Sequence, residues 1–381
     1  GLLINRARAL ADTIARELDA QVAGDVRRWR DVVHELALVS SAPDSLDRLE
    51  SSPTVVAIVE RDSSHAVGVT VEGIPVELVV AAPRLYGTEL VRATGSAEYV
   101  ASLGELPDAE TEEELYARLG LPWCPPELRE APLHREPPAL VGLAAIRGDL
   151  HCHTTWSDGK ASVEEMAIAA RDRGYEYIAI CDHTPNVRVV PGLDADALLR
   201  QAEEIADVNE GLAPFRVLRG TECDIRSDGT LDLPDAALAA LDWVQLSLHA
   251  GQRQEAEGLT RKVVEAMRHP AVRCLSHPKG RIINHRPPNA LQLERVIEAA
   301  LEEGIALETN GLPDRLDLRD EEVRLAVEAG VPIVCSTDAH SVRGLGNMEL
   351  AVMTARRGWA TAADVLNTRG LDEVLGLRSP P

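Results

Sequence analysis

Nine side chains of the types that bind metal ions lie in the C-terminal two-thirds of the sequence, most of them directly after a short apolar run. They are six of the eleven histidines and three acids: His151, His153, Asp158, His183, Glu222, His249, His277, Asp338 and His340. Each one alone has an ordinary explanation, such as a capped turn or a core histidine bonded to a carbonyl. The same placement after successive runs predicts a shared polar site at the mouth of a β/α barrel.

The residue types and their spacing indicate metal-assisted hydrolysis. Side chains two residues apart on a strand point the same way, so His151 and His153 can bind one ion. Mixed imidazole and carboxylate ligands suit Zn, Mn or Fe(II) better than Ca or Mg. The ligands outnumber the needs of two ions, so we expect up to three, an arrangement suited to phosphoryl displacement by metal-activated water. The sequence contains neither GxSxG nor a P-loop.

The elements that must position these residues are short apolar runs separated by helix-like sequence. The strands that we expect lie at 177–181, 215–218, 243–248, 272–275 and 331–335. The helices that we expect lie at 163–173, 195–210, 260–269, 292–303 and 321–328. This alternation predicts an α/β fold with a parallel sheet or barrel that begins near residue 146.

A smaller α+β unit is expected before the barrel. Leu10, Ile14 and Leu18 recur at helical spacing, which predicts a helix over residues 2–20. Apolar runs separated by Gly and Pro predict strands at 32–39, 54–59, 67–71 and 76–80. A segment dense in Pro then predicts a connection on the surface. The domain boundaries that we expect are 1–121, a Pro-rich linker over 122–145, and 146–381.

Composition narrows the classes of protein. The net charge of −23 argues against a protein that clamps long duplexes without sequence preference, although local arginine patches could meet phosphates. No run approaches the ~18 apolar residues of a membrane span, and the charged N-terminus does not resemble a signal peptide. The six cysteines form no CxxC pair, so we expect reduced thiols and a cytoplasmic protein. The chain begins without Met, as a fragment or a processed chain does. Nothing in the sequence indicates an oligomeric state.

Six segments resemble the motifs of the PHP (polymerase and histidinol phosphatase) phosphoesterase domain, a distorted seven-stranded β/α barrel. They are DLHCHTTWSDG, ICDHT, GTECDI, LSLHA, LSHP and STDAH. The ligand groups that the resemblance implies are His151, His153, Glu222 and Asp338 for one ion, Glu222, His249 and His277 for a second, and Asp158, His183 and His340 for a third. The first group also comprises the residues that we expect to be catalytic.

Flanking segments narrow the resemblance to the PHP domain that is fused to bacterial X-family DNA polymerases. Those in the barrel are HPKGRIINHRPP, LETNGLPDRLDL and DAHSVRGLGNMELAVMTARRGW. Those in the first domain look like the polymerase palm and its exit segment: AGDVRRWRDVVHELALV, GIPVELVV, YGTELVRATGS and LYARLGLPWCPPELRE. The helix-hairpin-helix and fingers regions that precede the palm in that family have no counterpart in this sequence.

The palm-like domain departs from the family where nucleotidyl transfer needs acids on neighbouring strands to hold two metal ions. The matching positions are Glu35, Ala37 and Glu77, and Ala37 cannot coordinate an ion. At the position that meets the triphosphate, Asp25 follows Gly24 and places a negative charge against phosphate. We therefore predict a degenerate palm without polymerase activity, and favour a scaffold role against the barrel over a DNA-binding role.

Basic and polar residues near the predicted cluster are candidates for binding substrate phosphate. The substrate-binding residues that we expect are Lys279, Arg281, Asn310 and Arg315. Asp149 and Asp182 are candidates to orient ligand imidazoles from outside the ligand set.

The resemblance implies a metal-dependent phosphoesterase that acts on DNA ends as a 3′→5′ exonuclease, a 3′-phosphatase or an enzyme that cleaves at abasic sites. A small-molecule phosphatase of the histidinol-phosphate kind is a second hypothesis, since the metal motifs would serve either substrate. A non-catalytic DNA-repair accessory module is a third, and the complete ligand set argues against it. The expected partners are accordingly DNA ends or a phosphorylated small molecule.

Overall fold

The structure, a computed structural model, describes residues 1–378. It divides into two compact units, Gly1–Pro138 and Ala139–Pro381. Part of the segment that was expected as a linker belongs to the first unit, where Cys124, Leu128 and Arg129 are buried. No helix in the described part of the chain is long and apolar enough to cross a membrane.

The first unit is a small α+β structure built on a five-stranded mixed sheet. In spatial order its strands are β2 (Ala20–Ala23), β4 (Leu36–Ser40), β7 (Pro75–Val80), β6 (His65–Thr70) and β5 (Val55–Arg61). β4 and β7 run parallel, and the other neighbours are antiparallel. The strands are rich in Val, Leu and Ala, which fit a half-buried pleated surface.

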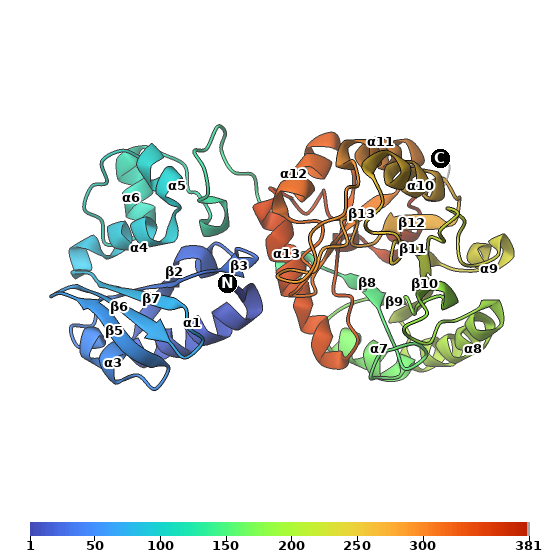
Figure 1. Ribbon diagram of the computed structural model, residues 1–381, viewed down its shortest axis with the longest axis horizontal. Coiled ribbons are helices and arrows are strands. Elements are labelled where there is room, and N and C mark those ends of the chain that lie inside the picture. Colours follow the sequence, from blue (N-terminus) through green and yellow to red (C-terminus); the bar gives the residue numbers. More distant parts are fainter. Residues whose placement is uncertain (379–381) are drawn as a thin grey trace. The chain divides into compact units, whose positions relative to one another are not determined.

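Helices cover both faces of this sheet. They are α1 (Ile4–Leu18), α2 (Gly24–Arg27), α3 (Ser45–Ser51), α4 (Tyr86–Thr94), α5 (Ala97–Ser102) and α6 (Glu112–Leu119). In Figure 1, α1 and α3 lie on one face, and α4, α5 and α6 lie on the other. The helix predicted over residues 2–20 is α1, which buries Ile14 and Leu18 as its spacing requires.

The run predicted as one strand over residues 32–39 forms two. β3 (Val32–Val33) pairs antiparallel with β1 (Leu2–Leu3) in a separate ribbon, whereas β4 joins the five-stranded sheet. His34 and Glu35 lie between the two strands. Both strands carry apolar residues, so the local sequence gives no sign that the pairing partner changes.

The second unit contains seven parallel strands that lie in sequence order. They are β8 (Gly148–Cys152), β9 (Tyr177–Ile180), β10 (Arg216–Asp224), β11 (Trp243–Ser247), β12 (Val272–Leu275), β13 (Ala306–Asn310) and β14 (Ile333–Ser336). Each pair of neighbours runs parallel. The predicted α/β fold class, a seven-stranded barrel preceded by a smaller α+β region, is confirmed.

The first and last strands nearly close this barrel. Cys152, at the end of β8, forms a parallel bridge with Ala339, which follows β14. Lower in the gap, the Asn367 amide nitrogen donates to the carbonyls of Gly148 (2.8 Å) and Cys335 (2.7 Å), and its oxygen accepts from the Cys335 amide (3.1 Å). A side chain thus replaces the ladder hydrogen bonds that the two edge strands lack.

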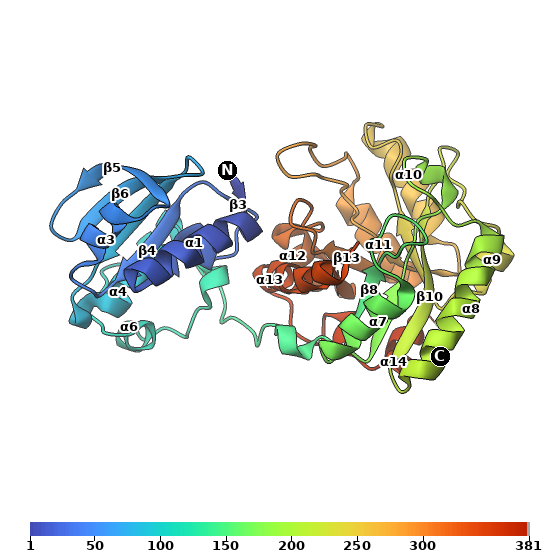
Figure 2. The ribbon, with the colours of Figure 1, turned by 90° about the horizontal axis from the view of Figure 1, so that it is seen from below.

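The helices of this unit lie outside the strands, as Figures 1 and 2 show from two directions. They are α7 (Val163–Asp172), α8 (Ala195–Leu212), α9 (Asp235–Ala239), α10 (Ala256–Met267), α11 (Leu293–Glu303), α12 (Asp320–Ala329), α13 (Met348–Arg357) and α14 (Leu371–Leu375). A capping box begins α7, in which the Ser162 and Glu165 side chains bond to each other's backbone amides.

The barrel interior changes from apolar to polar along each strand. One buried apolar cluster takes a side chain from every strand, including Trp243, Cys274, Ala306 and Val334. Strand side chains alternate, so the residue two places further on also faces the interior. Those residues are Gln245, Ser276, Glu308 and Ser336, and all four are polar and buried. The barrel therefore has an apolar floor and a polar upper end at the carboxyl ends of its strands.

Candidate metal centre

The structure brings all nine predicted ligand residues to the upper end of the barrel. Glu222 lies on β10, His151 on β8 and Asp158 in the loop after β8, and the other six lie just beyond the ends of their strands. Eight of the nine, all but His340, are at most a quarter exposed at the side chain, and five are essentially buried. Residues separated by up to about half the chain thus meet because parallel strands present their carboxyl ends at one edge.

Three overlapping groups have ligand atoms close enough to hold an ion. In each group the ligand atoms all lie within 4.8 Å of one another. The groups are His153, Asp158, His183 and His340; His151, His153 and Asp338; and His183, Glu222 and His249. The site can therefore bind metal ions at more than one position.

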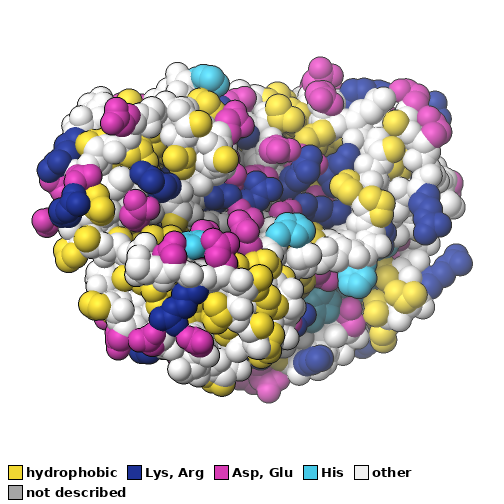
Figure 3. All heavy atoms as spheres, turned by 60° about the vertical axis from the view of Figure 1, so that its left-hand side comes forward, with side chains coloured by type: hydrophobic (Ala, Val, Ile, Leu, Met, Phe, Trp, Pro, Cys, Tyr) yellow, Lys and Arg dark blue, Asp and Glu magenta, His cyan; other side chains and the backbone are white. Residues whose placement is uncertain are grey.

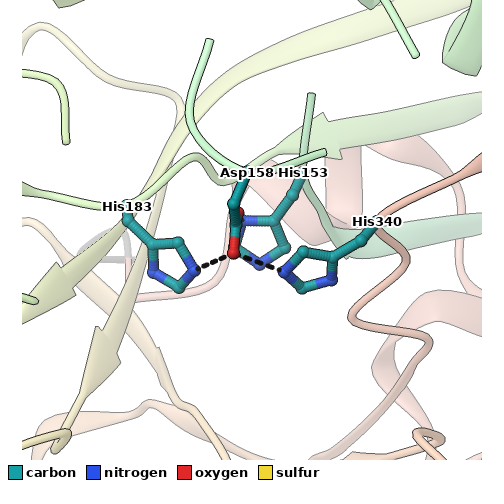
Figure 4. Close-up of side chains that lie close together, drawn as sticks. All are labelled: His153, Asp158, His183 and His340. Atoms are coloured by element: carbon teal, nitrogen blue, oxygen red, sulfur yellow. Dashed lines mark ion pairs between the residues drawn. The ribbon is translucent and has the colours of Figure 1, made fainter. Parts of the chain in front are cut away.

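The first group surrounds Asp158. Figure 4 shows the Asp158 carboxylate between the rings of His183 and His340, with His153 beside it. The Asp158 Oδ2 atom lies 3.2 Å from His340 Nε2 and 3.5 Å from His183 Nε2. These are spacings between donor atoms that one ion can join, since a metal ion lies about 2 Å from each nitrogen or oxygen ligand.

The second group lies deeper and joins the two histidines of the HxH pair. His153 Nε2 lies 2.9 Å from Asp338 Oδ1 and 3.2 Å from His151 Nε2. His151 Nε2 lies 3.6 Å from the same Asp338 oxygen. The Asn310 amide donates to the other Asp338 oxygen at 2.9 Å, so Oδ1 stays directed at the imidazoles.

The third group is centred on Glu222, whose two oxygens face different histidines. Oε2 lies 3.1 Å from His183 Nδ1 and 3.4 Å from His151 Nε2. Oε1 lies 2.8 Å from His277 Nε2 and 3.3 Å from His249 Nε2. Glu222 thus borders the second group as well as its own, so it could help to hold an ion in either group.

The grouping differs in detail from the one that the family resemblance implied. His183 faces both Asp158 and Glu222, so it belongs to two groups instead of one. His153 is shared in the same way between Asp158 and Asp338. His277 lies against Glu222 but is outside the three compact groups.

Unsatisfied polar atoms in this buried site fit a bound cation. The buried atoms without a hydrogen-bond partner among the described residues include Glu222 Oε2, His183 Nδ1 and His153 Nδ1. A buried polar atom without a partner costs free energy, and such atoms are rare in folded proteins. Here Glu222 Oε2 and His183 Nδ1 face each other, so one ion between them would satisfy both.

The acids of the site remain anionic despite their burial. Burial alone would raise the pKa of Glu222, but His249, His183 and His151 together hold it well below its usual value. Burial likewise opposes ionisation of Asp338, and the charge of His151 is the strongest influence that keeps its pKa well below the usual range. Both residues therefore present charged oxygens to a cation.

The pKa values of two ligand imidazoles are shifted in opposite directions by their surroundings. Burial opposes protonation of His183, but Glu222 raises its pKa to about 10. Burial and the neighbouring His183 lower the pKa of His153 to about 4. A neutral His153 is the form that ligates metal, whereas His183 must release a proton to do so.

Asp149 and Asp182 do not orient the imidazoles in the way that we expected. Asp182 accepts hydrogen bonds from the Thr154 amide (2.8 Å) and the Ser157 hydroxyl (2.6 Å), and so fixes the loop after β8. Asp149 accepts from the His151 amide (3.2 Å) and from Thr337. Both acids shape the backbone around the ligands and contact no ligand ring.

Two other acids contact ligand rings, and we did not single them out from the sequence. Glu308 Oε1 lies 2.6 Å from His151 Nδ1, and Asp224 Oδ1 lies 3.3 Å from His249 Nδ1. Asp224 is two residues after Glu222 on β10, so strand alternation was the signal that could have located it. The same alternation from Ala306 locates Glu308.

The four expected substrate-binding residues have different surroundings. Lys279 Nζ donates to the Leu291 carbonyl (2.7 Å), and Asn310 is buried against Asp338. Arg281 is also buried, and its guanidinium donates to the carbonyls of Arg315 and Leu316, both at 2.7 Å. Arg315 has no side-chain hydrogen bond within residues 1–378, and its Nε lies 3.9 Å from Asp338 Oδ2. Arg315 thus retains donors for substrate beside the ligand cluster.

In the first unit, two of the three positions matched to polymerase acids lie opposite each other on neighbouring strands, whereas Glu35 precedes β4. Ala37 on β4 pairs in register with Glu77 on the neighbouring β7. Glu77 Oε1 lies 2.8 Å from His65 Nε2, so its carboxylate already has a partner. Asp25, at the position expected to meet a triphosphate, pairs with Arg28.

Comparisons with known proteins identify a matching family and several relatives of this chain. Residues 149–310 match the family described as the PHP domain. A protein of Bacillus subtilis (strain 168), named DNA polymerase/3'-5' exonuclease PolX, is 39% identical over 275 residues, which are 71% of this chain and 48% of that protein. This chain therefore spans about half the length of that relative.

Other relatives are named probable phosphatases, and this chain covers most of their length. An Acetivibrio thermocellus protein named "Probable phosphatase" is 32% identical over 201 residues, 50% of this chain and 78% of that protein. A Thermoanaerobacter sp. (strain X514) protein, also named a probable phosphatase, is 30% identical over 58% of this chain and 89% of its own length.

Proposed function

The chain belongs to the PHP domain family, and on this premise we propose that it is a metal-dependent phosphoesterase that hydrolyses phosphate esters at DNA ends. The observation that carries the proposal is the meeting of nine histidines and acids at one barrel mouth, eight of them in three groups whose ligand atoms lie within 4.8 Å. The unpartnered Glu222 oxygen within this site supports it further, because an anionic oxygen without a donor there suits a cation.

The ligands divide into groups that would hold up to three ions. Mn and Zn are the metals that best suit mixed imidazole and carboxylate donors. When bound, such ions activate a water molecule for attack on phosphorus and neutralise charge on the phosphate oxygens. We assign the catalytic role to His151, His153, Glu222 and Asp338, which line the deepest part of the site. Asn310 keeps Asp338 directed at the imidazoles through its amide.

Arg315 is the residue of this chain best placed to bind substrate phosphate. Its guanidinium lies beside Asp338 and retains its donors. The backbone around it is held by Arg281, which bonds to the carbonyls of residues 315 and 316. A guanidinium fixed in this way can bind two phosphate oxygens at once without ordering a mobile loop.

DNA ends are proposed as the substrate because 71% of the chain is similar to a protein named a DNA polymerase/3'-5' exonuclease. Polymerase activity is proposed to be absent. Ala37 lacks a carboxylate opposite Glu77, and Glu77 is paired with His65. A small-molecule phosphatase is the second candidate, favoured by the relatives named probable phosphatases, which align over most of their own length.

The test is hydrolysis by the full chain loaded with Mn²⁺ or Zn²⁺. The substrates are a single-stranded oligonucleotide, the same oligonucleotide with a 3′-phosphate, a duplex with an abasic site, and histidinol phosphate. We expect cleavage of at least one DNA substrate, abolished by chelator and by His151→Ala or Asp338→Ala. Glu77→Ala serves as the matched control and should cleave normally.

Turnover of histidinol phosphate alone would replace the DNA proposal with the small-molecule one. A metal-loaded chain that is inert on all four substrates would refute both. Template-directed incorporation of nucleotides by the wild-type chain would contradict the assignment of Ala37.

A further inference from the structure

Glu308 is a fully buried carboxylate at the centre of the metal site that belongs to none of the three ligand groups. It lies on β13, between β12 and β14 in the barrel wall. Strand alternation directs its side chain into the polar upper half of the interior. Such a group needs an explanation, because a buried charge is costly unless other groups compensate for it.

Both oxygens of Glu308 are saturated with donors. Oε1 accepts from His151 Nδ1 (2.6 Å), from the Gln245 amide (2.9 Å) and from the Ser336 hydroxyl. Oε2 accepts from the His277 backbone amide (2.6 Å), from the Ser276 hydroxyl (3.2 Å) and at longer range from the Asn310 amide (3.4 Å). A carboxylate has about four lone-pair sites, so none remains for an ion.

This saturation separates Glu308 from Glu222. Glu222 Oε2 has no hydrogen-bond partner in the described part of the chain, as expected of an oxygen that ligates an ion. Glu308 has the opposite character, because every donor around it is already directed at its oxygens. Its chemistry is therefore that of a hydrogen-bond acceptor for ligand residues.

The orientation of the Glu308 network is fixed from the barrel floor. The Trp243 indole donates to the Gln245 side-chain oxygen at 2.8 Å, which leaves the Gln245 nitrogen to face Glu308. The amide of Gln245 therefore cannot supply an acceptor to His151. The proton between His151 and Glu308 must then lie on the histidine Nδ1, so the neutral imidazole that can ligate an ion carries no hydrogen on Nε2.

From this geometry we infer that Glu308 is a positioning residue that fixes the Nδ1–H form of His151 and directs its Nε2 at the ion. The Nε2 atom faces Asp338 Oδ1 of its own group (3.6 Å) and Glu222 Oε2 of the third group (3.4 Å). The same carboxylate holds the backbone amide of His277, a second predicted ligand. The inference rests on the proposed function, since it concerns how the proposed ligands are held.

A carboxylate that accepts the second ring N–H of a ligand histidine raises the basicity of the ligand. Loss of such a partner typically weakens metal binding by about 10–100-fold. Glu308→Gln keeps the shape of the side chain but places an amide NH₂ where donors already converge. The substitution should therefore replace one of the two accepting oxygens of Glu308 with a donor, without opening a cavity.

The experiment is a titration of the metal-free full chain with Co²⁺, followed by the visible absorption of the bound ion. We expect Glu308→Gln to bind one ion about 10–100-fold more weakly than the wild type, with a changed cobalt spectrum, while the remaining ions bind normally. Glu322→Gln is the matched control. Glu322 is also a buried glutamate of the barrel, but its hydrogen bond caps α12 and it contacts no predicted ligand.

A Glu308→Gln titration that superimposes on the wild-type curve and spectrum overturns the inference. If this variant does not fold, nitrogen NMR of the histidines in the metal-loaded wild-type chain tests the inference instead. There the inference requires a ligated imidazole with a strongly hydrogen-bonded proton on Nδ1, and its absence overturns the inference equally. Neither measurement uses a phosphate ester, so a wild-type chain that binds cobalt but hydrolyses nothing refutes the proposed function and leaves the role of Glu308 standing.

Discussion

Two arginines near the metal site look equivalent in the sequence, yet their guanidinium groups have different surroundings. Arg281 is buried and bonded to two backbone carbonyls, whereas Arg315 has donors to spare beside Asp338. A guanidinium that is already satisfied by carbonyls stabilises the fold, and one that is unsatisfied near a cation site is available to an anion. The two residues therefore make a contrasting pair for mutation.

We predict that Arg315→Ala lowers kcat/KM for a phosphate ester by roughly 10–100-fold, because a hydrogen bond to a charged group contributes about 1.5–3 kcal/mol. The unfolding temperature should change little. Arg281→Ala should show the reverse, with a free energy of unfolding lowered by a few kcal/mol, since two carbonyls lose their donors. Steady-state kinetics and thermal unfolding of both variants check the pair, and equal kinetic losses would contradict the assignment.

At the scale of elements, the loop between β13 and α12 contains a buried acid whose charge depends on pH. Asp317 is fully buried, and its Oδ1 accepts from the Lys279 amide at 3.1 Å. Its Oδ2 has no hydrogen-bond partner within the described residues. Burial, with a smaller contribution from Glu322, raises the pKa of Asp317 to about 7.

This raised pKa predicts how the free energy of unfolding depends on pH. Between the usual pKa of Asp, about 4, and pH 7, the folded chain holds a proton that the unfolded chain releases. The stabilisation is complete below pH 4 and is lost as pH rises through 7. Asp317→Asn stays uncharged, so it should unfold at a higher temperature than wild type at pH 8.5, with a free energy of unfolding greater by at most about 4 kcal/mol. At pH 5 most of that advantage should vanish, and an equal difference at both values would contradict the prediction.

The alternation of strands and helices was predictable because it depends on local spacing. His151 and His153 stand two residues apart at the end of a strand, and Asp338 and His340 repeat the pattern after the last strand. Period-2 spacing at a strand end places side chains on one side wherever the strand lies in the sheet. The upper end of a parallel barrel could therefore be inferred before its strand order was known.

Features that depend on meetings between distant segments could not be predicted in this way. Glu308 accepts from His151, which is separated from it by 157 residues, and its neighbours in sequence give no sign of that contact. The carbonyls that occupy Arg281 belong to a loop more than thirty residues further on. The split of residues 32–39 into β3 and β4 likewise depends on pairing with β1, at the start of the chain. Local pattern specifies an element and its faces, but not its partner.

At the scale of the whole molecule, the charge of −23 conceals local variation. Figure 3 shows Lys and Arg side chains lying in small groups among Asp and Glu side chains. Thirty-nine basic residues are enough to form such patches within an acidic surface. Binding of DNA by this chain should then be local and only weakly sensitive to salt, because few phosphates would be neutralised.

The two compact units differ in what the proposed reaction needs from them. All nine predicted ligands, Arg315 and Glu308 belong to the second unit, Ala139–Pro381. This unit also closes its own barrel through Asn367 and contains its own apolar core. A region with a complete core and no missing strand can fold without the rest of its chain.

We therefore predict that residues 139–381 alone fold cooperatively, take up the same number of metal ions as the full chain, and hydrolyse a small phosphomonoester with unchanged kcat/KM. The informative comparison is the KM for an oligonucleotide, measured for the full chain and for this fragment at two salt concentrations. If the palm-like unit is only a scaffold, the two KM values agree at both salts. If it binds DNA, the fragment shows a higher KM at low salt, while its rate on the small ester is unaffected. A fragment that folds but binds no metal would contradict the placement of the site within one unit, because none of its ligands lies before residue 151.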